Sequence, residues 1–150
     1  MNLVLEKTDQ VPCFTNMRWM LQALEISASE YDWYVSDIEM NQSSAAFTTE
    51  NRWLCGETLQ EFLESNEVQF IWAVFSAVPK GLRFAVERPP QADGNAHYWS
   101  GSEISPQLNG AVFEIACWDS SATLLIHMPA KAALAFLKTY PDARPLGAPS

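Results

Sequence analysis

Two carboxylates two residues apart are the arrangement in this chain that could do chemistry. Asp37 and Glu39 lie in an alternating segment, where residues two apart share one face of a strand. Paired carboxylates raise the pKa of one member and attract cations, so the pair could act as acid and base or hold a divalent cation. Asp32 and Glu114 are further acids that could join them. Two acids near a strand end are more often a solvated rim, and the pair alone defines no reaction.

A second feature is a predicted helix with acid on one side, followed by an apolar strand. Its glutamates recur at helical spacing, and a fourth lies just beyond the helix: Glu57, Glu61, Glu64 and Glu67. Leucine and phenylalanine fill the opposite side. Thr58 and Glu61 match a capping box, in which the hydroxyl and the carboxylate satisfy two free N–H groups of the first turn. We expect the glutamates to face solvent and to form an acidic binding surface.

Six tryptophans are many for this length, and exposed ones could stack on a sugar, a base or a partner protein. Most fit a core, as Trp72 and Trp118 do in their apolar strands. Tyr98 and Trp99 follow an Asp-Gly loop and precede Ser-Gly-Ser. We therefore predict that these two are surface aromatics and a candidate binding pair.

Several sequence signatures of chemistry are missing. The chain has no glycine-rich phosphate loop, no His-Glu-x-x-His, no cysteine pair at metal spacing and no Gly-x-Ser-x-Gly. Its two histidines cannot build a three-histidine metal site. We expect a protein without metal or cofactor, and these absences favour a non-enzymatic function over an enzyme.

Composition and charge narrow the class of protein. With 150 residues, of which 48% are hydrophobic and 18% charged, the chain suits one globular domain. A formal charge of −9 without any Lys/Arg cluster repels phosphate backbones and argues against nucleic acid, whereas a basic protein would be complementary. Such a balance is also common in soluble cytosolic proteins. Three cysteines, no signal peptide and no apolar run near the ~20 residues of a membrane span predict a cytoplasmic protein.

The order of predicted elements gives the fold class. We expect helices over 14–25, 56–65 and 129–140, and strands over 2–6, 31–39, 52–54, 68–77, 82–86, 111–118 and 122–128, with another about Phe47. The last two strands form a hairpin, and 88–95 is an exposed loop. The result is a single α+β domain over 1–140, a largely antiparallel β-sheet packed by about three α-helices, followed by a flexible C-terminal tail over 141–150.

Four stretches of the chain resemble a known family. They are the strand 31–35 with Glu39, the helix entry 54–59, the strand end 77–81 and the hairpin around Asp119. Together they resemble an uncharacterised bacterial family, domain of unknown function 2691, over most of the chain. The resemblance implies a small bacterial cytosolic domain without an assigned activity, so no catalytic residue is carried over from it.

Three function classes follow. The first is a non-enzymatic protein-binding protein, of the immunity type or regulatory, that covers a basic partner with its four glutamates and neighbouring aromatics. The second is a small-molecule-binding domain with a pocket between the sheet and residues 88–102, lined by Tyr98 and Trp99. The third is a carboxylate- or metal-dependent hydrolase that uses Asp37 and Glu39. An edge strand or the apolar face of the last helix can pair with a second copy, which leaves a homodimer open.

Overall fold

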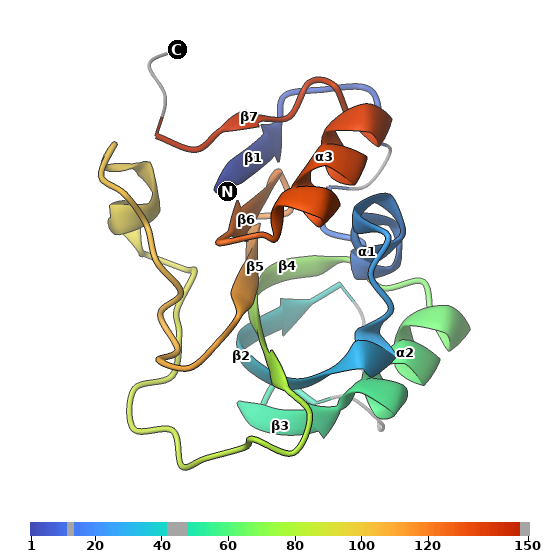
Figure 1. The fold of residues 1–150 in the computed structure, drawn as a ribbon, viewed down its shortest axis with the longest axis vertical. Coiled ribbons are helices and arrows are strands. Elements are labelled where there is room, and N and C mark those ends of the chain that lie inside the picture. The colour runs from blue at the N-terminus through green and yellow to red at the C-terminus, as the bar shows by residue number, and fades with distance from the viewer. Residues whose placement is uncertain (12–13, 42–47, 148–150) are drawn as a thin grey trace.

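One antiparallel sheet runs through the whole molecule (Figure 1). A computed structural model describes residues 1–11, 14–41 and 48–147. In this part of the chain seven strands lie in the order β3-β2-β4-β5-β6-β1-β7. They are β1 Leu3–Glu6, β2 Tyr31–Met40, β3 Arg52–Cys55, β4 Phe70–Pro79, β5 Phe113–Trp118, β6 Ala122–Ile126 and β7 Arg144–Pro145. With the three helices described next, this confirms the predicted α+β class and the antiparallel sheet.

Three helices cover one face of the sheet: α1 Met17–Leu24, α2 Gly56–Ser65 and α3 Ala130–Thr139. Asn16 caps the first helix, because its side chain accepts hydrogen bonds from two backbone N–H groups of α1. Trp33 and Phe113 lie fully buried between helices and sheet, with their rings edge to face at 5.7 Å. Burial of this apolar layer is the main stabilising term of the fold.

A long irregular segment, residues 80–112, covers the other face of the sheet, and we call it the strap (Figure 1). Its one regular element is the short 3-10 helix η2, Ala96–Trp99. The predicted strand over 82–86 is wrong. The preceding strand, β4, already pairs with β2 on one side and β5 on the other, so the chain that leaves it finds no open edge beside it. The 88–95 stretch is irregular as predicted, although Pro90 and Ala92 within it are buried.

The alternation of β2 breaks at Asp37. This residue has a positive φ of 54°, and the pairing of β2 with β4 shifts between Ser36 and Glu39. Such a bulge moves the following side chains to the opposite face of a strand. Ile38 therefore joins the core on the helix side. The predicted regular alternation through Asp37 and Glu39 is wrong for this reason.

Two further element predictions need correction, and one cannot be compared. Helix α2 begins at Gly56 and has no side-chain cap, so the capping box of Thr58 and Glu61 does not form. The tail is not wholly unstructured, because Arg144 and Pro145 form β7 against β1 and Arg144 pairs with Glu6. The predicted hairpin is confirmed as β5 and β6. The strand about Phe47 lies outside the described residues.

The start of α2 generates a first prediction. A Cβ atom at Gly56 would approach the backbone carbonyl oxygens of Ala28 and Tyr31 well inside 3.0 Å, a distance that Cβ atoms essentially never reach. Because backbone must move to relieve this contact, Gly56→Ala should lower the free energy of unfolding by about 1–3 kcal/mol. Urea denaturation followed by circular dichroism measures it.

The matched control is Glu61→Ala, which changes an exposed position of the same helix. It should stay within about 0.5 kcal/mol of the wild type. Equal small effects of both substitutions would contradict the close packing of α2 on the carbonyl groups of Ala28 and Tyr31.

Candidate functional site

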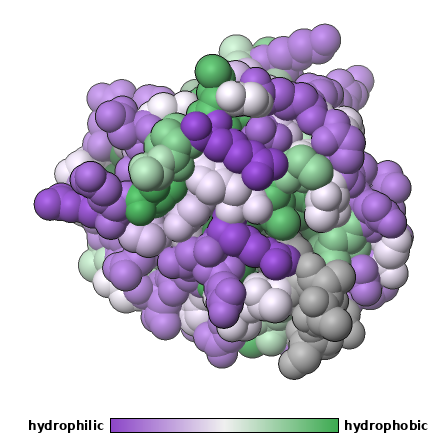
Figure 2. Space-filling model, turned by 90° about the horizontal axis from the view of Figure 1, so that it is seen from below, coloured by the Kyte–Doolittle hydropathy of each residue, from purple (hydrophilic) through white to green (hydrophobic). Residues whose placement is uncertain are grey.

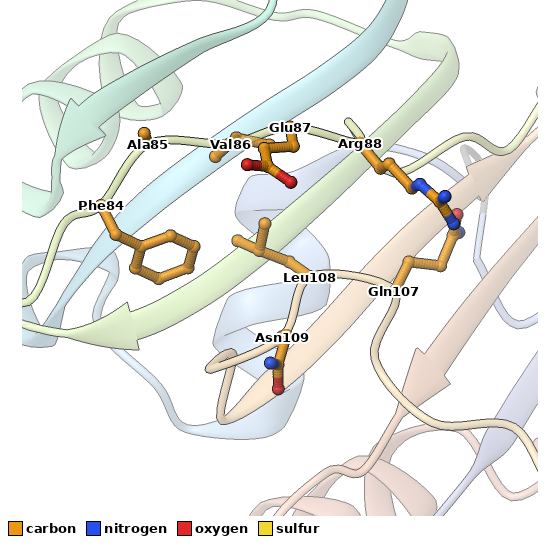
Figure 3. Close-up of a pocket in the computed structure, with 8 residues that line it drawn as sticks. All are labelled: Phe84, Ala85, Val86, Glu87, Arg88, Gln107, Leu108 and Asn109. Carbon is orange, nitrogen blue, oxygen red and sulfur yellow. The ribbon is translucent and has the colours of Figure 1, made fainter.

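The strap forms a pocket between two of its own segments (Figure 3). Residues 84–88 line one side and residues 107–109 the other, around a volume of about 350 Å³. The Phe84 ring and Leu108 supply apolar surface, while Glu87 and Arg88 bring charges of opposite sign. This volume lies at the lower end of the roughly 300–1,000 Å³ that small-ligand sites occupy. The pocket is not the one predicted, because neither Tyr98 nor Trp99 lines it.

A buried carboxyl group holds one wall of this pocket. Glu114 on β5 is fully buried and accepts hydrogen bonds from Ser76 Oγ at 2.7 Å, from the backbone N of Gln107 at 2.6 Å and from that of Leu108 at 2.9 Å. Burial raises the pKa of Glu114, against the effect of these three bonds. A carboxyl group this deep is tolerated only with hydrogen-bond partners, and the partners here are the strap backbone.

The Gln107 side chain fixes the same wall from the other direction. Its Oε1 accepts from the backbone N of Gln91 at 2.9 Å, and its Nε2 donates to the Gln91 carbonyl at 2.9 Å and to the Tyr98 hydroxyl at 2.5 Å. Tyr98 is 1% exposed, and burial raises the pKa of its hydroxyl. The prediction that Tyr98 is a surface aromatic is therefore wrong.

Trp99 behaves differently from its neighbour. It is 37% exposed and packs edge to face on Trp118 with ring centroids 5.3 Å apart. Trp118 in turn packs edge to face on Trp72 at 4.9 Å, and both are partly buried against the strap side of the sheet. The predicted binding pair is thus divided between the interior and the surface.

The two candidate catalytic acids differ in their surroundings. Asp37 Oδ2 accepts hydrogen bonds from the backbone N of Ala92 at 2.9 Å and of Asp93 at 2.8 Å, so this carboxylate anchors the strap. Glu39 is exposed. Among the described residues, no group of three or more His, Cys, Asp or Glu side chains could hold a metal ion.

Asp32, the further acid of β2, anchors the beginning of the strap. It is buried, which raises its pKa, but the Gly81 N–H at 3.0 Å and the Arg83 guanidinium at 3.3 Å outweigh this effect and leave the pKa lowered. The Asp32 carboxylate therefore anchors the strap, as the Asp37 carboxylate does.

The acidic surface is where it was predicted. Residues 25–67 carry ten of the 18 acidic residues and one of the nine basic ones, so this segment alone accounts for the whole formal charge of −9. It forms the short helix η1 (Ala28–Glu30), β2, β3 and α2, at one edge of the sheet. Figure 2 views the molecule from the side of β3, and hydrophilic side chains cover most of that face.

The four predicted glutamates of this surface are all exposed, but they differ in their partners. Glu57 pairs with Lys80, and Glu67 pairs with Arg18. Glu64 accepts a hydrogen bond from Gln60 at 2.7 Å, and neither Glu61 nor Glu64 forms an ion pair with a described cation. The outer side of α2 therefore carries two exposed acids, Glu61 and Glu64, without a described cation.

The two cysteines that the structure describes have different surroundings. Cys117 is buried next to Met17, with the two sulfur atoms 4.0 Å apart, and fits the expected small hydrophobe. Cys55 is half-buried and precedes α2, where its Sγ lies 2.9 Å from the Thr58 hydroxyl. Hydrogen bonding to the Thr58 side chain and backbone lowers the pKa of the Cys55 thiol. Among the described residues, no neighbour of the Cys55 thiol indicates a ligand.

Sequence reasoning missed the pocket residues Phe84, Glu87 and Arg88 as a group. A signal was available in Glu114, an acid in the middle of an apolar strand, because such a residue requires partners from a segment that covers it. The identity of that segment depends on the course of the strap across the sheet, which no local pattern specifies.

Comparison with protein-family models, curated proteins and solved structures finds no significant match to this chain. The resemblance to domain of unknown function 2691 therefore stays a prediction. In the described ranges no helix combines the length and apolar character needed to cross a membrane.

The buried carboxyl group generates a second prediction. Because the pKa of Glu114 is raised above its ordinary value of 4.5, its protonated form is favoured by folding. Its contribution is complete below the unfolded-state pKa and is lost as pH rises through the folded-state pKa. The free energy of unfolding of the wild type should therefore fall relative to that of Glu114→Gln as pH rises above 4.5, and the difference should then level off.

Urea denaturation of both proteins between about pH 4 and pH 8 measures this difference. The same comparison with Glu103→Gln, an exposed acid of the strap, should show no such slope. A wild type that gains stability over Glu114→Gln across this range would show that the three hydrogen bonds outweigh burial.

Proposed function

We propose that this chain is a small acidic bacterial cytosolic protein that binds another protein without catalysing a reaction, in an immunity-type or regulatory role. The observation that carries the proposal is the location of the entire formal charge on residues 25–67 at one edge of the sheet. A field of one sign at one end of a molecule steers a partner of opposite sign to that end. The partner is therefore a basic protein.

The outer side of α2 is the part of this edge that would contact the partner. Glu61 and Glu64 are exposed and lack a described cation, so they meet a basic side chain without first breaking an ion pair. Their helix is fixed through its opposite side, where Leu59 and Phe62 are buried. A rigid helix presents charges at fixed spacing, which favours a specific partner over any polycation.

The same charge argues against self-association through this edge. A second copy carries the same formal charge of −9, and the like charges of the two copies would repel each other across the interface. A homodimer would have to use the opposite edge or the exposed side of α3, where Leu134 is 62% exposed.

The experiment compares two doubly neutralised proteins. Glu61→Gln combined with Glu64→Gln removes two charges from the outer side of α2, and Glu103→Gln combined with Asp119→Asn removes two exposed charges from elsewhere. Each is immobilised beside the wild type, exposed to native bacterial lysate at low salt, and eluted with salt. Proteins retained by the wild type are identified by mass spectrometry and their affinities measured.

An exposed charge pair contributes about 0.2–1 kcal/mol, so the α2 variant should bind the wild-type partner roughly two- to thirtyfold more weakly. The control should bind within about twofold of the wild type. Equal weakening of both variants would show that only total charge matters. Recovery of no basic protein at low salt would also contradict the proposal.

A second candidate function, small-molecule binding, is favoured by the strap pocket. Its volume of about 350 Å³ and its mixture of apolar and charged lining fit a small polar ligand. A thermal-shift screen of metabolite classes tests it. A hydrolase based on Asp37 and Glu39 has less support, because the Asp37 carboxylate is occupied by backbone N–H groups of the strap.

A further inference from the structure

We propose that the strap pocket binds a free α-amino acid with an apolar side chain. The inference rests on the second candidate function and names its ligand class. It is independent of the acidic edge, because the pocket lies in the strap and not on α2.

Two opposite charges in the pocket are the first argument. Glu87 and Arg88 both line it, both are exposed, and neither forms an ion pair with a described residue. Figure 3 shows the Glu87 carboxylate directed over Leu108 and the Arg88 side chain extending toward Gln107. A carboxylate attracts an ammonium group, and a guanidinium pairs with a carboxylate through two parallel hydrogen bonds. An α-amino acid carries both groups on one carbon.

The apolar part of the pocket is the second argument. The Phe84 ring remains 38% exposed although it is large, and it faces the pocket opposite Leu108 (Figure 3). It is held from behind by Trp53, whose ring lies edge to face at 5.4 Å and whose indole N–H donates to the Phe84 carbonyl at 3.1 Å. An apolar side chain placed here would remove the exposed part of this ring from water, which favours binding.

The rigidity of the opposite wall is the third argument. The Gln107 and Leu108 backbone is fixed from below by the Glu114 carboxyl group, and the Gln107 side chain is fixed by Gln91. A wall that is ordered before binding costs less entropy when the ligand enters. The volume of about 350 Å³ suits a single amino acid better than a larger ligand.

The test uses L-leucine and two blocked forms of it. N-acetyl-L-leucine lacks the ammonium charge, and L-leucinamide lacks the carboxylate. Titration followed by two-dimensional NMR should show saturable binding of L-leucine with shifts at Phe84, Leu108 and the Trp53 indole N–H. Each blocked form should bind about tenfold more weakly, because each loses one charge-assisted contact.

Matched variants assign each contact. Glu87→Gln should remove the preference for L-leucine over its N-acetyl form, and Arg88→Gln should remove the preference over the amide. Glu103→Gln neutralises an exposed acid of the strap outside this pocket and should leave both preferences unchanged. The spectra of the free proteins show that each variant is folded.

Absence of saturable L-leucine binding, or preferences that survive both pocket variants, would overturn the inference. If the thermal-shift screen instead yields another ligand class whose binding is weakened by Phe84→Ala, the small-molecule function stands and the amino-acid assignment falls. Binding of a basic protein by α2 is unaffected by either result.

Discussion

The structure depends on how an irregular segment is held against a sheet. The strap lacks strands, so its backbone N–H and C=O groups need partners that a ladder would otherwise supply. Polar side chains on the strap side of the sheet provide them: Asp32 for Gly81, Ser36 for the Pro90 carbonyl, Asp37 for Ala92 and Asp93, and Glu114 for Gln107 and Leu108. This layer replaces the second set of helices that could have covered the face, and it leaves the outer side of the strap open for a pocket.

The same constraint changes the meaning of the acidic residues in the strands. A carboxylate that accepts backbone N–H groups is stabilised as an anchor, and those hydrogen bonds fix its position on the strap. This applies to Asp32 and Asp37, and burial separates Glu114 from solvent as well. Exposed acids that do not anchor the strap include those on α2 and Glu87 in the strap pocket. The candidate functions therefore belong to binding surfaces.

Local patterns predicted the elements whose stability is local. Three such predictions are confirmed: the amphipathic helix α1, the hairpin of β5 and β6, and the solvent-exposed glutamates of α2. The wrong predictions concern residues whose structure is determined by contacts with segments distant in the sequence. The 82–86 stretch alternates like a strand but has no free edge beside it, and Asp37 forms a bulge where it meets the strap. The capping box of Thr58 and Glu61 does not form, because α2 begins at Gly56 and Thr58 lies inside its first turn. Tyr98 has a surface-like context in sequence but is buried in the apolar cluster between the strap and the sheet, where its hydroxyl accepts a hydrogen bond from Gln107.

The two candidate surfaces differ in charge, although the pocket residue Phe84 packs on Trp53 of β3. Outside residues 25–67 the eight remaining acids and eight remaining bases balance, so the strap pocket lies in a part of the chain with no net charge. Short-range pairing of Glu87 and Arg88 with a ligand can therefore decide specificity there, since a neutral zwitterion gains nothing from long-range attraction. Long-range attraction does operate at the acidic edge, where negative charges predominate. It extends over about a Debye length, roughly 8 Å at physiological salt. Salt should therefore weaken binding of a basic protein more than binding in the pocket, a difference that follows from where this sequence places its charges.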